Sequence, residues 1–121
     1  MSIDPPPGGD IEIDTIEAIA GDGSLTPPAS PPWGGIDSTQ NQQIAGETTL
    51  INPTITVTIF PSVGGGSIWS GQAALGNAPI NSPVPWTCTV PAGTLAATSS
   101  YVIQAQNANG SVTATQPFST T

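Results

Sequence analysis

Three carboxylates stand at alternate positions near the start of the chain, at Asp10, Glu12 and Asp14. In an extended segment alternate side chains point to the same face, so these three would gather on one side. Carboxylate oxygens bind hard cations such as calcium, with help from backbone carbonyls, but this spacing does not fit an EF-hand loop. The preferred interpretation is a solvated acidic face or a set of salt contacts to a partner, and no metal site is predicted.

Groups that could carry out acid–base or nucleophilic catalysis are scarce. The 121-residue chain has no Lys, Arg or His, and no charged side chain follows Glu47. The usual general bases are therefore missing from that part of the chain. The single cysteine, Cys88, has no imidazole to activate it, and its alternating surroundings indicate a buried, unreactive thiol. We expect a protein that is not an enzyme, with no catalytic residue and no cofactor.

The charge is unevenly distributed along the chain, whose formal net charge is −8. All eight acids lie in the first 47 residues: Asp4, Asp10, Glu12, Asp14, Glu17, Asp22, Asp37 and Glu47. Binding to nucleic acid and attraction to anionic membranes both require cationic side chains, so the sequence excludes these two partner classes. The first part of the chain can meet a basic surface, whereas the remainder cannot do so through charge.

Other features bear on where the protein works. One cysteine cannot form a disulfide within the chain, and no apolar run reaches the roughly 18 residues of a membrane span. Residues 1–10 have neither the basic nor the apolar region of a secretory signal. We expect synthesis in the cytoplasm, followed by incorporation into a larger assembly.

Residues 1–47 are predicted to form an extended acidic N-terminal arm. Proline and glycine clusters at 5–9 and 26–35 favour extended backbone and break helices and central strands. Between them, residues 11–14 alternate apolar and acidic side chains and predict one short strand. In this arm the acids would meet basic partner residues, while isoleucines and a tryptophan would fill grooves. The predicted partner contacts are Asp10, Ile11, Glu12, Ile13, Asp14, Ile16, Glu17 and Trp33.

Residues 48–121 are predicted to form a β-sandwich. Strands with alternating apolar side chains are expected around residues 54–60, 86–90 and 101–106. Asn109-Gly110 follows the last of these and is a strong signal for a hairpin, with residues 111–115 returning beside it. Several short strands at this spacing, with no helical period, indicate an all-β fold.

The last hairpin resembles that of immunoglobulin-like domains. The similarity lies in the pattern Tyr101-x-Ile103-x-Ala105-x-Asn107-x-x-Gly110. The resemblance implies that Tyr101 is the corner tyrosine, whose hydroxyl bonds back to nearby backbone. It also implies that Ile103 and an apolar residue such as Val57 replace the two cysteines of the family, and that Trp69 is the core tryptophan. The residues taken as hallmarks of this fold are Trp69, Tyr101, Asn109 and Gly110.

The organisation of the chain is similar to that of some phage capsid decoration, or cement, proteins. That resemblance implies a virion structural protein whose arm grips the major capsid protein or another virion protein and whose neutral β-sandwich faces outward. It also implies a location on the capsid surface and a homo-oligomer, a trimer by analogy. Two alternatives stay open. One is a carbohydrate-binding or adhesive immunoglobulin-like module of a bacterial surface, and the other is an extracellular filament subunit that assembles by strand addition.

Overall fold

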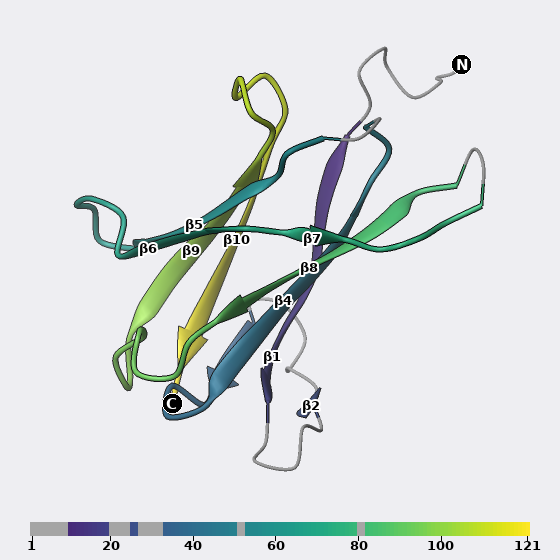
Figure 1. The fold of residues 1–121 in the computed structure, drawn as a ribbon. Helices are drawn as coiled ribbons and strands as arrows, with labels where there is room; N and C mark the ends of the chain where they lie inside the picture. The colour runs from purple at the N-terminus through teal and green to yellow at the C-terminus, as the bar shows by residue number, and fades with distance from the viewer. Residues whose placement is uncertain (1–9, 20–24, 27–32, 51–52, 80–81) are drawn as a thin grey trace.

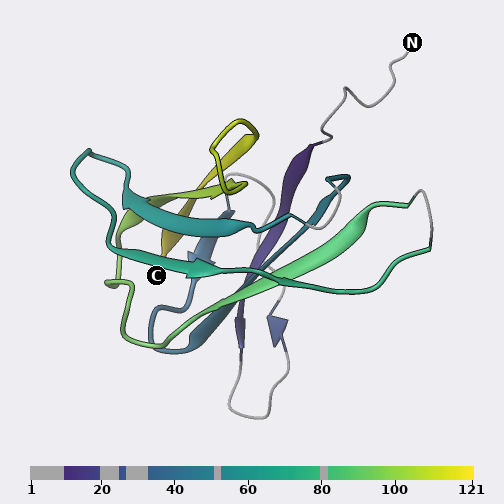
Figure 2. The same ribbon diagram turned by 45° about the horizontal axis from the view of Figure 1, so that its top comes forward.

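Two β-sheets face each other in the computed structural model of the chain, which describes residues 10–19, 25–26, 33–50, 53–79 and 82–121 (Figures 1 and 2). The strands are β1 (Ile11–Ile19), β2 (Leu25–Thr26), β3 (Trp33–Ile36), β4 (Asn41–Thr48), β5 (Thr56–Pro61), β6 (Trp69–Gln72), β7 (Ala74–Leu75), β8 (Val84–Val90), β9 (Ser100–Gln106) and β10 (Thr113–Thr120). The described residues form no helix, so none of their segments is a helix that could span a membrane.

The strand order is β2-β1-β4-β8-β7 in the first sheet and β3-β10-β9-β5-β6 in the second. Neighbouring strands run antiparallel, except that β3 runs parallel to β10. Strands β6 and β7 follow each other almost without a break and pass from one sheet to the other (Figure 1). The predicted all-β sandwich is confirmed.

The core lies between the sheets and is built from the alternation seen in the sequence. Each of β5, β8 and β9 turns every second side chain inward, which buries apolar groups and leaves mainly threonine and glutamine outside. The inward-facing sets predicted from the sequence are confirmed as buried: Ile55, Val57 and Ile59; Trp86, Cys88 and Val90; Tyr101, Ile103 and Ala105.

The β9–β10 hairpin and the chain preceding it are tied together by hydrogen bonds. Gly110, at a φ of 73°, and Asn109 form the turn, where the Asn109 side chain accepts a hydrogen bond from the Ser111 N–H at 3.0 Å. The Tyr101 hydroxyl accepts one from the Ala96 N–H at 2.8 Å, which is the backward bond expected of a corner tyrosine. Its ring stacks on Phe118, with centroids 5.5 Å apart.

The segment predicted to be an arm supplies strands to both sheets, so that prediction is wrong for residues 11–19, 33–36 and 41–47. Strand β1 pairs with β4 over its whole length, and β3 pairs with β10. Residues 1–9, 20–24 and 27–32 lie outside the described residues. The apolar side chains of β1 and β4 need the opposite sheet for burial, and this pairing is not visible in local composition.

Two expectations attached to the fold are also corrected. Val57 does not face Ile103 across the sandwich, because β5 is the neighbour of β9 in the same sheet. Among the tryptophan side chains that the structure describes, Trp86 is the buried one, at 1% exposed, whereas Trp69 is half-buried on β6 and packs against the core from its edge.

Gly46 lies where three strands of the first sheet meet. It is buried in β4, opposite Ile13 of β1 and Trp86 of β8. A Cβ at this position would collide with the Glu12 carbonyl oxygen and with the Trp86 indole ring. Both obstacles are rigid, since one is backbone and the other is a buried ring, so no side chain fits here.

Replacing Gly46 with alanine (Gly46→Ala) is expected to lower the free energy of unfolding by about 3 kcal/mol or more, because the added methyl overpacks the core. Urea denaturation followed by tryptophan fluorescence measures this change. The control is Gly66→Ala, where a Cβ meets nothing within 4 Å. Equal stability of the two variants would contradict the packing role of Gly46.

Candidate functional site

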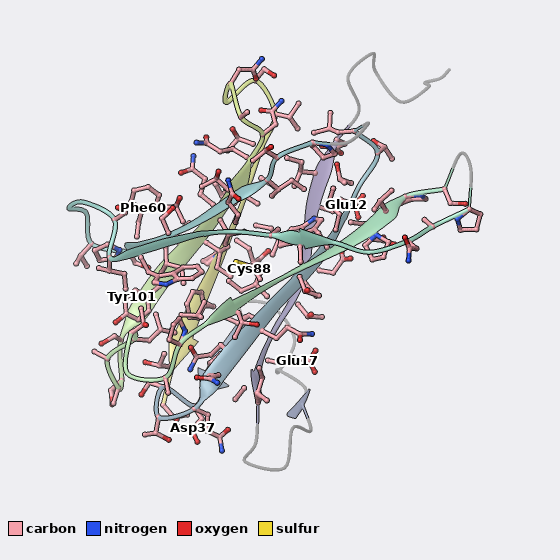
Figure 3. The ribbon with its side chains drawn as sticks, in the orientation of Figure 1. Glu12, Glu17, Asp37, Phe60, Cys88 and Tyr101 are labelled. Atoms are coloured by element: carbon pink, nitrogen blue, oxygen red, sulfur yellow. The ribbon has the colours of Figure 1, made fainter. Side chains whose placement is uncertain are left out.

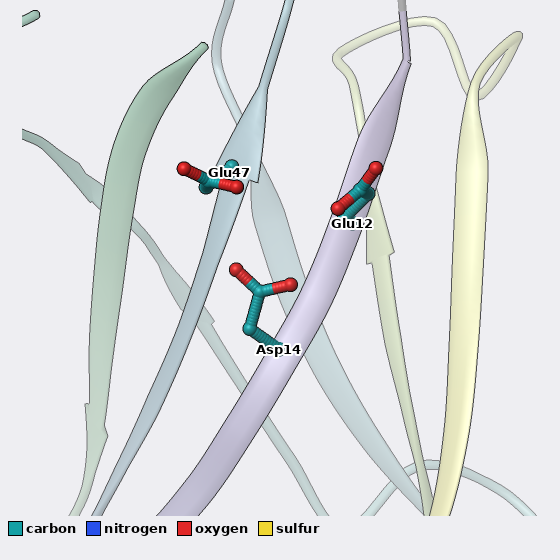
Figure 4. Close-up of side chains that lie close together, drawn as sticks. All are labelled: Glu12, Asp14 and Glu47. Atoms are coloured by element: carbon teal, nitrogen blue, oxygen red, sulfur yellow. The ribbon is translucent and has the colours of Figure 1, made fainter.

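A group of three carboxylates lies on β1 and β4. Glu12 and Glu47 are directly opposite each other in the antiparallel ladder, and Asp14 lies two residues further along β1. One carboxylate oxygen from each lies within 4.8 Å of the others. In Figure 4 the Asp14 carboxylate points toward β4 and Glu47. We call Glu12, Asp14 and Glu47 the acidic cluster.

A β-bulge brings Asp14 into this cluster. The pairing of β1 with β4 passes from Ile13–Gly46 to Thr15–Ala45, which leaves Asp14 as an extra residue without its own partner. Such a bulge shifts the inward–outward alternation of the side chains along the strand by one residue. The inward residues are Ile11 and Ile13 before the bulge and Ile16 and Ala18 after it, so the acids stay outside on both sides of the bulge.

The start of β1 is fastened to the end of β4 beside the cluster. The Asp10 N–H donates to the Thr49 hydroxyl at 2.8 Å, and the Asp10 carbonyl accepts from the Thr48 hydroxyl at 2.8 Å and from the Thr49 N–H at 3.1 Å. The Asp10 carboxylate accepts from the Ile11 N–H at 2.9 Å. These bonds hold Glu12 and Glu47 in register, because they fix the pairing only two residues away.

A small hollow opens next to the cluster, with a volume of about 30 Å³. It is lined by Asp10, Glu12, Glu47, Thr48, Thr49 and Pro83. Pockets that bind organic ligands are on the order of 300–1,000 Å³, whereas about 10–15 Å³ is enough for a water. The hollow therefore has no room for a sugar or peptide substrate. Its oxygens suit a water, a hard cation or the tip of a basic side chain.

The cluster has no cationic side chain of its own chain to pair with, since the sequence contains no Lys, Arg or His. Like charges directly opposite each other in a strand pair destabilise it, and Glu12 and Glu47 are such a pair. A cation or a basic group of another molecule would relieve this repulsion.

The predicted partner contacts divide into two kinds. The acids of β1 face outward, as expected, and Asp10, Glu12 and Asp14 are exposed. Ile11 and Ile16, by contrast, are buried in the core, and Ile13 packs against it. These isoleucine side chains are therefore not available to contact a partner. They fill the core because β1 is a strand of the sandwich. Both other partner-contact candidates lie on strands, Glu17 on β1 and Trp33 on β3, and the Trp33 side chain lies outside the described residues.

Sequence reasoning missed Glu47, Thr48 and Thr49 as members of the site. Glu47 is separated from Glu12 by 35 positions, and only the β1–β4 pairing brings the two together. The available signal is the period-2 pattern of β4, in which Ile44 and Gly46 point inward and Glu47 outward. That pattern is hard to recognise because Gln42 and Thr48, which also point inward, are polar.

Asp37 lies apart from the cluster, in the turn between β3 and β4. Its carboxylate accepts hydrogen bonds from the Thr39 hydroxyl at 2.6 Å and the Thr39 N–H at 2.9 Å. These two bonds, the hydroxyl first, lower the pKa of Asp37 below its usual value. The side-chain amide of buried Gln42 donates to the Asp37 carbonyl at 2.8 Å. Asp37 thus shapes the turn and positions a core residue.

The described carboxylate side chains lie on β1 and β4, at Asp10 just before β1, and at Asp37 in the turn between β3 and β4. Figure 3 shows Glu12 and Glu17 along β1 and Asp37 near the start of β4. Strands β5 to β10 carry no charged side chain. Searches with this chain match no protein-family model, no curated protein and no solved structure. Charge distribution and fold are therefore the observations that bear on its function.

Neutralising Glu47 with glutamine (Glu47→Gln) should stabilise the fold by about 0.2–1 kcal/mol at low salt, because it removes the cross-strand repulsion. The gain should shrink as NaCl is raised, since salt screens exposed charges. Thermal unfolding at several NaCl concentrations measures both effects. Glu17→Gln is the matched control, because Glu17 is opposite the neutral Gln43. If both variants gain equally, Glu12 and Glu47 do not repel each other specifically.

Cys88 is the one nucleophilic thiol, and it is buried on the inner face of β8. Burial raises the pKa of the thiol to about 11. A thiol is unreactive while protonated, so the position of Cys88 keeps it out of any chemistry at neutral pH. Its Sγ lies 3.6 Å from the Gln72 carbonyl oxygen, within reach of a weak hydrogen bond.

The raised pKa of Cys88 predicts a loss of stability at alkaline pH. The unfolded thiol ionises near 9.0 and the folded thiol near 11. Between these values the unfolded chain binds fewer protons, so the free energy of unfolding falls as pH rises. Urea denaturation at pH 8 to 11 measures this slope, which Cys88→Ala should flatten. An equal slope in the variant would assign the effect to another group.

Proposed function

We propose that this protein is a non-catalytic structural component of a larger assembly, of the capsid decoration type. It would attach to a virion shell through its acidic side, which is the part of the surface on β1 and β4 that carries the acidic cluster. The neutral remainder of the sandwich would face outward. The observation that carries the proposal is the segregation of charge. The described carboxylates lie on β1 and β4, at Asp10 just before β1 and at Asp37 in the β3–β4 turn, whereas the strands from β5 onward are uncharged.

The proposal includes an immunoglobulin-like topology for the sandwich. In that family four strands in the order A-B-E-D form one sheet, and C, F and G form the other. Here β1-β4-β8-β7 follows the first order and β10-β9-β5 follows the second in reverse, with β6 added beyond β5. The backward hydrogen bond of Tyr101 supports the same assignment.

In this proposal the protein attaches through the acidic cluster and its neighbours, and not through an apolar arm that fills grooves of the shell. No Lys, Arg or His side chain of the chain can pair with the carboxylates of Glu12, Asp14 and Glu47, so in this proposal they bind Lys or Arg side chains of a shell protein. Opposite charges across an interface guide encounter and fix orientation. The partner in this proposal is the major capsid protein or another virion protein with a basic surface.

The neutral side suits permanent exposure. The outward residues of β8 and β10 include four exposed threonines, Thr87, Thr89, Thr113 and Thr115. A surface without titratable groups keeps its charge over a wide range of pH and responds little to salt. These are useful properties for a component on the outside of a particle.

The test is co-sedimentation of the purified protein with shells assembled in its absence. The triple variant Glu12→Gln/Asp14→Asn/Glu47→Gln should bind about tenfold or more weakly, because it removes the charge-assisted contacts. Binding of the wild-type protein should weaken as NaCl rises.

The control variant is Asp37→Asn, which removes one charge outside the cluster and keeps an oxygen that can accept the Thr39 hydrogen bonds. It should bind like the wild-type protein. Binding of the triple variant with undiminished affinity would reject attachment through the acidic side.

Carbohydrate binding is the second function expected from the sequence, and it finds less support in the described residues. Sugar sites stack their ligands on exposed aromatic faces. Trp86 is buried and Trp69 is half-buried and packed against the core. A glycan array with the purified protein tests this alternative, which requires sugar-dependent binding.

A further inference from the structure

The tip of the β9–β10 hairpin carries Asn109-Gly110, the one Asn-Gly pair in the sequence. Ala108, Asn109, Gly110 and Ser111 are all exposed, and the tip projects from one end of the second sheet (Figure 1). The backbone nitrogen of the residue after an asparagine can attack the carbon of the side-chain amide. Gly110 has no Cβ to hinder that approach. The pair is therefore placed where a spontaneous chemical modification can occur.

The Asn109 side chain is folded back over the backbone that follows it. Its Oδ1 accepts the Ser111 N–H at 3.0 Å, which is the arrangement of an Asx turn. The ring closed by this hydrogen bond contains both the Asn109 Cγ and the Gly110 nitrogen, so the two reacting atoms are held in one tight turn. The donated N–H also stabilises the negative charge that grows on Oδ1 during attack.

One backbone hydrogen bond has to open before Gly110 can react. The Gly110 N–H donates to the Asn107 carbonyl at 3.0 Å, and the nitrogen attacks only after it has lost this proton. A hydrogen bond at an exposed hairpin tip opens at a lower cost in free energy than one within the sheet. Gly110, at a φ of 73°, also retains the backbone freedom that ring closure requires.

The other described asparagines are less suited to this reaction. Asn41, Asn77 and Asn107 each precede a residue with a Cβ, which hinders the attacking nitrogen. Asn107 is also restrained at both ends of its amide, since its Oδ1 accepts the Val112 N–H at 3.0 Å and its Nδ2 donates to a serine hydroxyl at 3.0 Å. Sequence and geometry therefore distinguish the Asn-Gly pair from these three positions.

We propose that Asn109 is a site of spontaneous deamidation in the folded protein. The Gly110 nitrogen loses its proton to hydroxide and forms a bond to the Asn109 Cγ. The Cγ–Nδ2 bond then breaks, and Nδ2 takes up a proton and leaves as ammonia. Water opens the resulting succinimide ring at one of its two carbonyls, which gives either aspartate or isoaspartate at position 109.

The modification changes both charge and backbone. It places a carboxylate in the part of the chain after Glu47, which otherwise has no charged side chain. Aspartate at position 109 still accepts the Ser111 N–H, so the turn keeps its shape. Isoaspartate adds a CH2 group to the backbone before Gly110 and disrupts the hydrogen bond from Gly110 to Asn107. The neutral side of the sandwich thus gains charge as the protein ages.

Incubation of the purified full chain at neutral to alkaline pH tests the proposal. Chymotrypsin cleaves after aromatic residues, so the peptide from Val102 to Phe118 carries both Asn107 and Asn109. Liquid chromatography and mass spectrometry of this peptide separate asparagine, aspartate and isoaspartate. Asn109 is expected to react about tenfold or more faster than Asn107, because the residue after it has no Cβ. The rate should rise with pH, and both products should form.

The same chain unfolded in guanidinium chloride gives the reference rate. If native Asn109 stays intact over several half-lives of the unfolded chain, the turn protects this residue and the proposal is overturned. Equal rates at Asn107 and Asn109 in the native protein would also contradict it, because the hairpin would then not distinguish the two positions.

Two variants connect the chemistry to this residue. Asn109→Gln has a longer side chain that closes the corresponding larger ring much more slowly. In isoelectric focusing it should keep its charge, whereas the wild-type protein gains one negative charge beyond its −8. The matched control is Asn77→Gln, at an exposed position elsewhere, which should age like the wild-type protein. An equal charge change in Asn109→Gln would assign the modification to another residue.

Discussion

The close approach of β1, β4 and β8 at Gly46 is the constraint on which the first sheet depends. The missing side chain lets the Glu12 carbonyl approach from one side and the Trp86 ring lie against the other. Trp86 is the largest fully buried side chain, so the same position also sets how the core is filled. The bulge at Asp14 is adjacent, and it directs the acids outward while the isoleucines on both sides of it stay inward.

This local geometry has an electrostatic consequence. The bulge and the β1–β4 pairing bring Glu12, Asp14 and Glu47 within a few ångströms of one another, and the sequence has no Lys, Arg or His side chain that could neutralise them. Repulsion between exposed carboxylates is modest in water and weakens with salt, so the fold tolerates it. The same repulsion becomes a source of binding energy once a basic group of another molecule approaches. In the proposed function, assembly with a basic partner neutralises the charge of this acidic side.

The two sides of the sandwich differ in charge and in the exposure of apolar side chains. On the acidic side, charge and the bulge keep identical copies apart while favouring a basic partner. On the side formed by β6, the side chains are neutral, and Ile68 and Leu75 are exposed. The described surface thus divides into an acidic part and a neutral part.

Local pattern was enough to predict the strands of the neutral part. The inward sets of β5, β8 and β9 and the turn at Asn109-Gly110 follow from a period of two and from turn chemistry, which act between near neighbours in the chain. Asp10, Glu12 and Asp14 were likewise expected on one face from their spacing alone. The absence of Lys, Arg and His, and with it the classes of partner that are excluded, is a property of composition.

Only the tertiary structure decided that the first 47 residues contribute strands to the sandwich. The polar inward residues Gln42 and Thr48 conceal β4, and the bulge interrupts the alternation of β1. The choice of Trp86 over Trp69 as the core tryptophan and the addition of Glu47 to the acidic cluster depend on which strands pair. Such pairings join residues that are 22 to 48 positions apart. Their energy comes from burial between the sheets, which no local pattern in the sequence encodes.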